Sequence, residues 1–504
     1  MLIRIFFHNF LKIIILFNFL NLVNAFAELP DLGSSSSVDL SLEGEKILGG
    51  QIYNRLLNSG IILDDAEATD FLKLELKKII SAGVRDNLIV GESLKLIEGF
   101  DIFLINDPML NAFALPGAKI GVHTGLIFGV DTEGEFMSVL THELAHVTQR
   151  HISRMYGNNK ESSALMMAAA ILSAMALTSS NADAAMGIIS LGQGAALQKR
   201  LSFSKSAENE ADRLGLRLLQ ASGYHPNEMI SMLEKLSLRN RLSAKNAPWF
   251  STHPLDYERI AEIESRISMN LRKNFKNNSQ IQNAFEWIKI RLENNLRFTN
   301  NEESNLLLID SGKHNLKSLW EFFWSSLRHG DLKLATKTIN ELSESVSLLS
   351  NRGKFLPMIS VAKATLFKKL GKHAQVVNEV ESMEKSSGFS IQHHSARALL
   401  RLKLESLLSL NQLQSAEKTA KWLIENWPND YTVWGYRAMI AEKLNQRSNA
   451  HIYTAEKYAA MGEWDMASEQ LRIAREGEKL DYITLSKLDF RLNQINSKIK
   501  EILK

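Results

Sequence analysis

The chain contains no cysteine in its 504 residues, so it has neither disulfide bonds nor thiolate ligands for a metal ion. Any bound metal must therefore be held by histidine, aspartate or glutamate side chains. The sequence also lacks an excess of one charge. Its 59 basic and 56 acidic residues leave a formal net charge of +3, and no run of like charges stands out. Nucleic acid is therefore not expected as a partner.

Residues 1–27 form an apolar leader in which Arg4 and Lys12 accompany a long hydrophobic run. The A-x-A pattern at residues 25–27 is typical of a cleavage site and predicts a signal peptide that is removed after Ala27. An uncleaved N-terminal anchor is the alternative, because the apolar run is long for a signal peptide. Either reading places the bulk of the protein outside the cytoplasm.

Length and composition indicate that the rest of the chain forms two domains. At 504 residues with 45% hydrophobic content, it is too long for a single core. Residues 28–272 combine helical periodicity with one β-like region, in which residues 102–105 and 119–124 read as strands. Residues 273–504 are polar helical sequence without β signals. We predict a mainly α domain with a small β-sheet, followed by an all-α domain.

Residues 164–197 are rich in alanine, methionine and glycine and carry one charged residue, Asp183. Each apolar half is shorter than the roughly 20 residues that a membrane span needs. Two interpretations stay open: a hairpin of buried helices, or a mobile lid or membrane-surface element above a cleft.

Four short motifs in residues 273–504 each resemble the turn between two packed helices. They are Gly330 with Leu332 and Ala335, Gly371 with His373 and Val376, Asn411 with Leu413 and Ala416, and Gly462 with Trp464 and Ala467. After Asn411, the spacing of Ala420, Leu423, Pro428 and Trp434 resembles a tetratricopeptide repeat. An ordinary helical bundle is the alternative. In both cases stacked helical hairpins offer a grooved surface for a protein partner.

The stretch VLTHELAHVTQRH indicates a metal site. His142 and His146 lie one helical turn apart, so both rings project from one face and can share a cation. Glu143 beside the first ligand can reach a water molecule activated by the metal, which is the arrangement for metal-assisted hydrolysis. His151 lies roughly 180° around a continuous helix from His142, so we expect it to be structural.

A third ligand is available in SAENEADRLGLRLLQASG. Glu208 and Asp212 are again one turn apart, and Glu208 would complete a His₂Glu site with an open position for water. Asp212 would then accept a ring N–H from a ligating histidine as an outer partner. Glu210 competes for the ligand role, but it projects about 200° away from Glu208 on a helix.

HELAH followed by ENEAD resembles the HExxH and ExxAD motifs of the zinc metallopeptidases that include the CAAX prenyl proteases and the HtpX-type proteases. The segment NAFALPGAKIGVHTGLI is similar to the one that precedes the catalytic helix in that family. The resemblance implies one Zn²⁺ per chain, held by His142, His146 and Glu208, with Glu143 as the catalytic base.

The leader and the helical repeats narrow the resemblance to periplasmic members of Gram-negative bacteria. It then implies, as partners, unfolded or stalled outer-membrane proteins and the outer-membrane barrel assembly machinery, engaged through residues 273–504. It also implies a place in the periplasm, with a peripheral position at the outer membrane as an alternative to a free one.

FSTHPLDYERI resembles a loop in this family whose histidine can bind the zinc, which implies that His253 plugs the open coordination position. On the residues alone, a histidine before a proline in a polar loop is more often a turn residue than a metal ligand. Arg259, a few residues further on, is a candidate for stabilising the oxyanion.

We expect the second strand to bind substrate. Pro116 and Gly117 at its start are typical of an edge strand, to which an unfolded peptide could add. The residues of this strand are Lys119, Ile120, Gly121, Val122, His123 and Thr124. A covered strand without a ligand is the alternative.

These features predict a zinc metalloendopeptidase, with chaperone-like activity as an addition, in outer-membrane quality control. A second hypothesis is a non-proteolytic chaperone or assembly adaptor with a latent or structural metal site. A third places the zinc domain at the membrane surface, through residues 164–197, where it acts on lipoproteins. Glu143 favours the enzyme, because a structural metal site does not need a carboxylate directed at a bound water.

Overall fold

The computed structural model describes residues 40–156, 203–242, 253–255, 257–267, 284–296, 315–477 and 481–502. The leader at residues 1–27, the segment 164–197 and the expected domain boundary at 272/273 lie outside these ranges. The described residues from Leu40 onward belong to one compact unit. Within the described ranges, no helix combines the length and apolar character of a membrane span.

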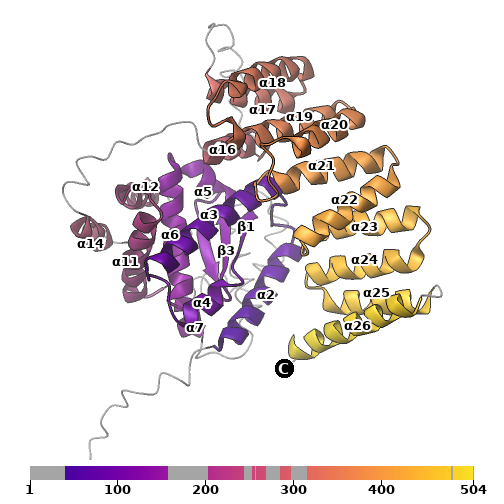
Figure 1. Ribbon diagram of the computed structural model, residues 1–504. Helices are drawn as coiled ribbons and strands as arrows, with labels where there is room; N and C mark the ends of the chain where they lie inside the picture. The colour runs from indigo at the N-terminus through magenta and orange to yellow at the C-terminus, as the bar shows by residue number, and fades with distance from the viewer. Residues whose placement is uncertain are drawn as a thin grey trace, which may run out of the picture. The chain divides into compact units, whose positions relative to one another are not determined.

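The N-terminal part consists of helices around one small sheet (Figure 1). The helices are α2 (Leu42–Asn58), α3 (Ala66–Arg85), α4 (Glu92–Ile97), α5 (Thr124–Gly129), α6 (Glu133–Thr148), α7 (His151–Tyr156), α11 (Lys205–Ala221), α12 (Asn227–Leu242) and α14 (Tyr257–Arg266). Four of them start at a side chain that accepts a hydrogen bond from a backbone N–H of the first turn, as N-caps do. These caps are Ser41, Asp65, Thr132 and Ser204.

The sheet has three strands, β1 (Asp101–Ile105), β2 (Ala112–Leu115) and β3 (Lys119–His123), in the order β1-β3-β2. β3 runs parallel to β1 and antiparallel to β2. The β2–β3 hairpin turns at Gly117 and Ala118, which have φ angles of +70° and +59°. At Gly117 a side chain would also meet the backbone of Lys46, at 2.7 Å, so glycine is required for two reasons.

The prediction that residues 119–124 form an edge strand is wrong. β3 is the central strand, with a partner on each side, and Thr124 already starts α5. Pro116 lies at the hairpin turn and not in a strand, so its missing N–H says nothing about an open edge. Among the described residues, β1 and β2 are the outer strands of the sheet; residues 61–63 bond to the end of β1, and β2 packs against α6.

The C-terminal part is helical throughout its described residues. Its α-helices are α16 (Ala284–Leu296), α17 (Leu316–His329), α18 (Leu332–Ser347), α19 (Leu356–Lys369), α20 (His373–Lys385), α21 (Ala396–Ser409), α22 (Leu413–Asn426), α23 (Tyr431–Lys443), α24 (Arg447–Ala460), α25 (Trp464–Glu476) and α26 (Tyr482–Ile502). A short 3₁₀ helix spans Arg352–Lys354. Consecutive helices from α21 to α26 lie side by side (Figure 1). The predicted fold class, mainly α with a small sheet and then all α, is confirmed.

All four predicted turns occur between consecutive helices with a left-handed residue. The φ angles are +80° at Gly330, +71° at Gly371, +55° at Asn411 and +76° at Gly462. The small residues that follow them, Ala335, Val376, Ala416 and Ala467, are fully buried, as close helix packing requires. A fifth turn of this kind, at Asn445 with φ +58°, was not predicted.

The N-cap and the first turns of α3 bind arginines of the C-terminal helices. Arg291 of α16 pairs with Asp65 at 2.7 Å, and Arg397 of α21 pairs with Asp70 at 2.8 Å. One hydrophobic core also runs without a break from α2 to α19. Apolar packing and ion pairs therefore both join the sheet-containing part to the helical hairpins.

Candidate metal centre

Two closely packed helices supply the polar side chains of the site. His142, Glu143 and His146 lie on α6 and are buried, and Glu208 and Asp212 lie one turn apart on the facing helix α11. The two helices approach closely at Gly215, where a Cβ atom would lie 3.2 Å from the backbone of His142. A glycine at this position thus brings the carboxylates of α11 within reach of the histidines of α6.

Four side chains converge on one point. One nitrogen or oxygen atom from each of His142, His146, Glu208 and His253 lies within 4.8 Å of the other three, and all four residues are buried. The Nε2 atoms of His142 and His146 are 3.0 Å apart. Glu208 lies 3.5 Å from the first of these nitrogens and 3.4 Å from the second. The structure thus brings together the three predicted ligands and the predicted plug.

Outer partners fix the ring of His142 and the carboxylate of Glu208. Asp212 accepts from Nδ1 of His142 at 3.0 Å, which turns Nε2 of that ring toward the cluster. Arg259, which is also buried, donates to Asp212 through Nε at 2.7 Å and lies 2.7 Å from Glu208. It also donates to the carbonyl of Pro254 at 2.7 Å, next to His253 in the chain.

The position of Arg259 does not support the expected oxyanion role. Its guanidinium lies between two buried carboxylates and a backbone carbonyl, and the residue is only 1% exposed. The sequence could not show this arrangement, because Asp212 and Arg259 are 47 residues apart.

His151 and Glu210 form a chain of polar contacts that ends at His146, the second histidine of α6. α6 ends at Thr148, and Arg150 has a φ angle of +54°, so His151 does not continue the helix as the angular argument assumed. Its Nδ1 lies 2.9 Å from Nδ1 of His146, and its Nε2 lies 3.2 Å from Glu210. Neither residue belongs to the four-residue cluster.

Phe203 is a residue of the site that the sequence analysis missed. Its ring stacks on His146 with a centroid distance of 4.0 Å and also lies beside His253, at 5.2 Å. The sequence signal that could have pointed to Phe203 is its position, five residues before Glu208 and directly before the N-cap of α11 at Ser204.

Burial and charge act in opposite directions on the ionisable groups. Although burial favours the neutral ring, hydrogen bonds and charges from Asp212 and Glu208 raise the pKa of His142 to about 10. Burial lowers the pKa of His146 well below its usual value. Burial also opposes ionisation of Glu208, but His253 and the two histidines of α6 hold its pKa well below the usual range. Glu208 is therefore a carboxylate.

Glu143 occupies a different environment from Glu208. It is fully buried, and its nearest charge partner is His253, whose Nε2 lies 3.6 Å from Oε1. Burial raises the pKa of Glu143, and His253, His142 and the backbone N–H of Ala114 in β2 offset only part of this effect. A carboxyl group with a raised pKa is suited to accept and return a proton near neutral pH.

The donor set fits zinc. Asp212 and His151 occupy the Nδ1 atoms of His142 and His146, so the two Nε2 atoms face each other and the Glu208 carboxylate inside a buried space. A cation there would be bound by imidazole nitrogens and one carboxylate oxygen, which is the ligand set of catalytic zinc sites. The outer hydrogen bonds on both rings are those of metal-ligating histidines.

The comparisons agree with this geometry. Residues 84–267, which hold all four members of the cluster, match peptidase family M48. The part of the chain that holds the cluster is therefore similar to the M48 metallopeptidases, and the chain is a zinc metalloprotease.

Its relatives include a protein similar over nearly the whole chain. The chain is homologous to the beta-barrel assembly-enhancing protease of Escherichia coli K12, with 27% identity over 93% of this chain and 91% of that protein. The protein of the same name from Yersinia pestis is 31% identical over 48% of this chain and 47% of its own length. The mitochondrial metalloendopeptidase OMA1 of Schizosaccharomyces pombe is 27% identical over 45% of this chain and 62% of its own.

Proposed function

We propose that the protein is a periplasmic zinc metalloendopeptidase that degrades or assists misassembled outer-membrane β-barrel proteins. The observation that carries the proposal is the buried cluster of His142, His146 and Glu208 with Glu143 beside it. His142, His146 and Glu208 would hold the zinc, and Asp212 orients His142. The peptidase domain corresponds to residues 28–272, and the helical domain, with tetratricopeptide-like repeats, to residues 273–504.

Bound zinc would polarise the scissile carbonyl and make water more acidic. Glu143 takes the proton of the attacking water and delivers it to the leaving amine. Burial raises the pKa of Glu143 above its ordinary value, which favours its role as a proton acceptor. Arg259 holds Glu208 and Asp212 in place, so it acts as a positioning residue.

His253 closes the site at rest. Its Nδ1 lies 2.9 Å from Glu208 and 3.5 Å from Nε2 of His142, while its Nε2 faces Glu143. A substrate carbonyl needs the same space, so the loop of His253 and Pro254 must move before cleavage. The Pro254 carbonyl accepts a hydrogen bond from Arg259, which connects this loop to the carboxylates of Glu208 and Asp212.

Substrate selection follows from the fold and from the relatives. Within the described ranges β2 has a strand partner on one side only, and it packs against α6, so an extended substrate pairs with β2 and not with β3. Hydrogen bonds to the substrate backbone depend little on the substrate sequence. Selectivity therefore depends on which proteins are unfolded. The names of the bacterial relatives support outer-membrane barrel proteins as clients, the expected leader supports export, and the helical hairpins offer a surface for the assembly machinery.

A second candidate function is that of a chaperone or assembly adaptor whose metal site is latent. The observation in its favour is the seated position of His253, which fills the space that a substrate needs.

The test is cleavage of a purified outer-membrane barrel protein, presented unfolded or folded, by wild-type protein and His253→Ala with equal zinc content. We expect cleavage of the unfolded form only, and faster cleavage by His253→Ala. If zinc is bound yet neither protein cleaves, while both suppress aggregation of the client, the adaptor function replaces the enzyme.

A further inference from the structure

Phe203 contacts two histidine rings of the metal centre that have different tasks in the reaction. Its ring stacks on His146 at a centroid distance of 4.0 Å and an interplanar angle of 27°, and it lies 5.2 Å from the ring of His253 at 39°. His146 is one of the proposed metal ligands, and His151 contacts its outer nitrogen. His253 must leave before a substrate can enter. Phe203 therefore connects a part of the site that stays with a part that moves.

The position of Phe203 is fixed by the helix that carries Glu208. Phe203 directly precedes Ser204, the N-cap of α11, whose side chain accepts a hydrogen bond from the backbone N–H of Ala207. The side chain of Phe203 is half-buried and packs against the main hydrophobic core. The ring is thus held both by α11 and by the core, so it stays in place when the loop of His253 moves.

The polar contacts of His253 involve groups that the metal site needs for other purposes. Nδ1 of His253 lies 2.9 Å from Glu208, and its Nε2 lies 3.6 Å from Glu143. The carbonyl of the next residue accepts a hydrogen bond from Arg259, which also binds two carboxylates. Phe203 has no ionisable or metal-binding atom. Its contact with His253 can therefore strengthen closure without altering the metal ligands or the base.

The contact between the two rings favours the closed site. Opening separates the imidazole of His253 from the ring of Phe203 and exposes apolar surface of that ring to water, which costs free energy. A pair of aromatic rings contributes enough to change an equilibrium about 3- to 10-fold beyond the effect of the buried area. The stack of Phe203 on His146 is present in both states, so it does not affect the balance between them.

We propose that Phe203 is a positioning residue that holds His253 in the metal site and so sets the fraction of molecules that are open at rest. The inference rests on the proposed function, in which His253 closes the site. Only open molecules admit a substrate, so the rate of cleavage is proportional to the open fraction while that fraction is small. Loss of the ring should therefore raise the rate only in a protein that carries His253.

The test is a double-mutant cycle with zinc content matched in all proteins. It compares wild type, Phe203→Leu, His253→Ala and the double variant in cleavage of an unfolded outer-membrane barrel protein. Phe203→Leu should raise the rate about 3- to 10-fold when His253 is present and have no further effect in the His253→Ala background. Leucine keeps an apolar side chain before the N-cap but lacks a ring. Phe203→Tyr keeps the ring, so its rate should rise less.

A second measurement does not depend on proteolysis. A chromogenic chelator is added to each zinc-loaded protein, and the rate of zinc release is recorded without substrate. Because a seated His253 blocks the open coordination position, Phe203→Leu should release zinc about 3- to 10-fold faster when His253 is present and have no further effect without it. Tyr257→Leu is the control. It removes an aromatic ring that is 69% exposed, four residues after His253, and it should match wild type in both measurements.

Two results would overturn the proposal. An equal effect of Phe203→Leu with and without His253 would show that the ring acts on His146 or on the substrate instead. Unchanged rates in a folded Phe203→Leu protein would show that the ring does not hold His253. Phe203→Met, with an unbranched side chain, replaces Phe203→Leu if that variant does not fold.

The two measurements also separate this inference from the proposed function. If none of the proteins cleaves, the proposed function fails, whereas the rates of zinc release still decide the role of Phe203. Cleavage by all of them, at rates that do not depend on Phe203, would contradict the inference alone.

Discussion

The Nδ1 atoms of His146 and His151 lie 2.9 Å apart, and the far nitrogen of His151 lies 3.2 Å from Glu210. When Nε2 of His146 binds a metal, its Nδ1–H must donate to His151, and His151 in turn donates to Glu210. A carboxylate and a histidine thus orient the second metal-binding ring, as Asp212 orients the first.

Replacing His151 by leucine removes the acceptor from the buried ring of His146. We expect zinc affinity, measured by competition with a chromogenic chelator, to fall about 10- to 100-fold. Glu210→Gln should have a smaller effect, because Glu210 is 44% exposed and water can replace it. His329→Leu, on the exposed end of α17, is the control. Unchanged affinity in a folded His151→Leu protein would show that the His146–His151 contact does not orient the ligand.

Replacement of glycine by alanine should change the stability in opposite directions at two positions inside helices. At Gly215 the new methyl group would lie 3.2 Å from the backbone of His142, so Gly215→Ala must push α6 and α11 apart. At Gly435 the nearest atom, at 3.6 Å, belongs to the flexible side chain of Lys457. Gly435→Ala should raise the free energy of unfolding by up to about 1 kcal/mol through helix propensity. Gly215→Ala should lower both thermal stability and zinc affinity, and a stabilised Gly215→Ala protein would contradict the close approach.

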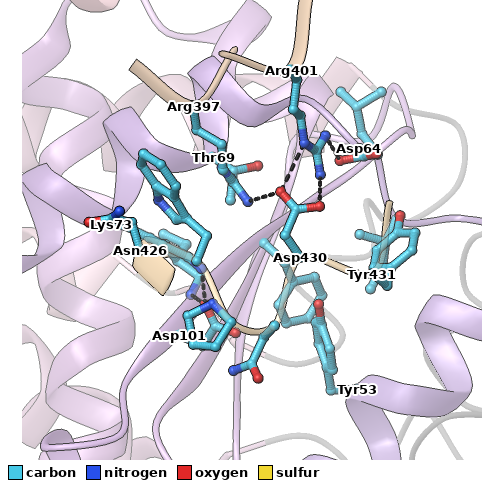
Figure 2. Close-up of a pocket in the computed structure, with 17 residues that line it drawn as sticks. Tyr53, Asp64, Thr69, Lys73, Asp101, Arg397, Arg401, Asn426, Asp430 and Tyr431 are labelled. Carbon is cyan, nitrogen blue, oxygen red and sulfur yellow. Dashed lines mark hydrogen bonds and ion pairs between the residues drawn. The ribbon is translucent and has the colours of Figure 1, made fainter. Parts of the chain in front are cut away.

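Arg401 of α21 binds one buried and one exposed aspartate (Figure 2). Loss of the arginine should lower the stability more than loss of the exposed aspartate. Arg401 binds Asp430, which is 4% exposed, and Asp64, whose side chain is 37% exposed. Arg401→Met leaves a buried carboxylate without its main partner and should cost about 3 kcal/mol in the free energy of unfolding. Asp64→Asn, at the exposed end, should cost less than about 1 kcal/mol. Denaturant unfolding of both variants checks this order, and equal costs would refute it.

Glu133 in the first turn of α6 predicts a dependence of stability on pH. Burial, together with the charge of Glu75, raises the pKa of Glu133 to about 7. The unfolded chain ionises this group near the ordinary value of 4.5, so the folded state loses stability as pH rises from about 4.5 to 7. Glu133→Gln should therefore be more stable than wild type by about 3 kcal/mol at pH 8 and equal to it at pH 4. Thermal unfolding at matched zinc content would disprove this if the difference did not change with pH.

Local sequence patterns were enough to predict those parts of the site that lie on a single helix. His142 and His146, and again Glu208 and Asp212, are four residues apart, and a helix places such pairs on one face whatever surrounds it. The helical turns at Gly330, Gly371, Asn411 and Gly462 were predictable for the same reason, since a left-handed residue between two amphipathic helices is a local signal.

Contacts between distant segments were not predictable in this way. The apolar pattern of residues 119–123 fits an edge or a central strand equally well, and only the parallel pairing with β1 decides between them. The partners of Arg259 lie on another helix, and the turn at Arg150 that directs His151 toward His146 carries no glycine to mark it. Such features depend on how α6, α7, α11 and α14 pack, which a single sequence does not display.

The most direct test of the central claim is the rate of peptide-bond hydrolysis in an unfolded barrel protein, measured in the His253→Ala background with Glu143 intact or replaced by glutamine. Zinc content is quantified for both proteins, because the comparison requires equal occupancy. If Glu143 handles the proton, Glu143→Gln should retain its zinc and lose about 10²- to 10⁴-fold in rate. Equal rates at equal zinc content would contradict a catalytic role for the HELAH helix.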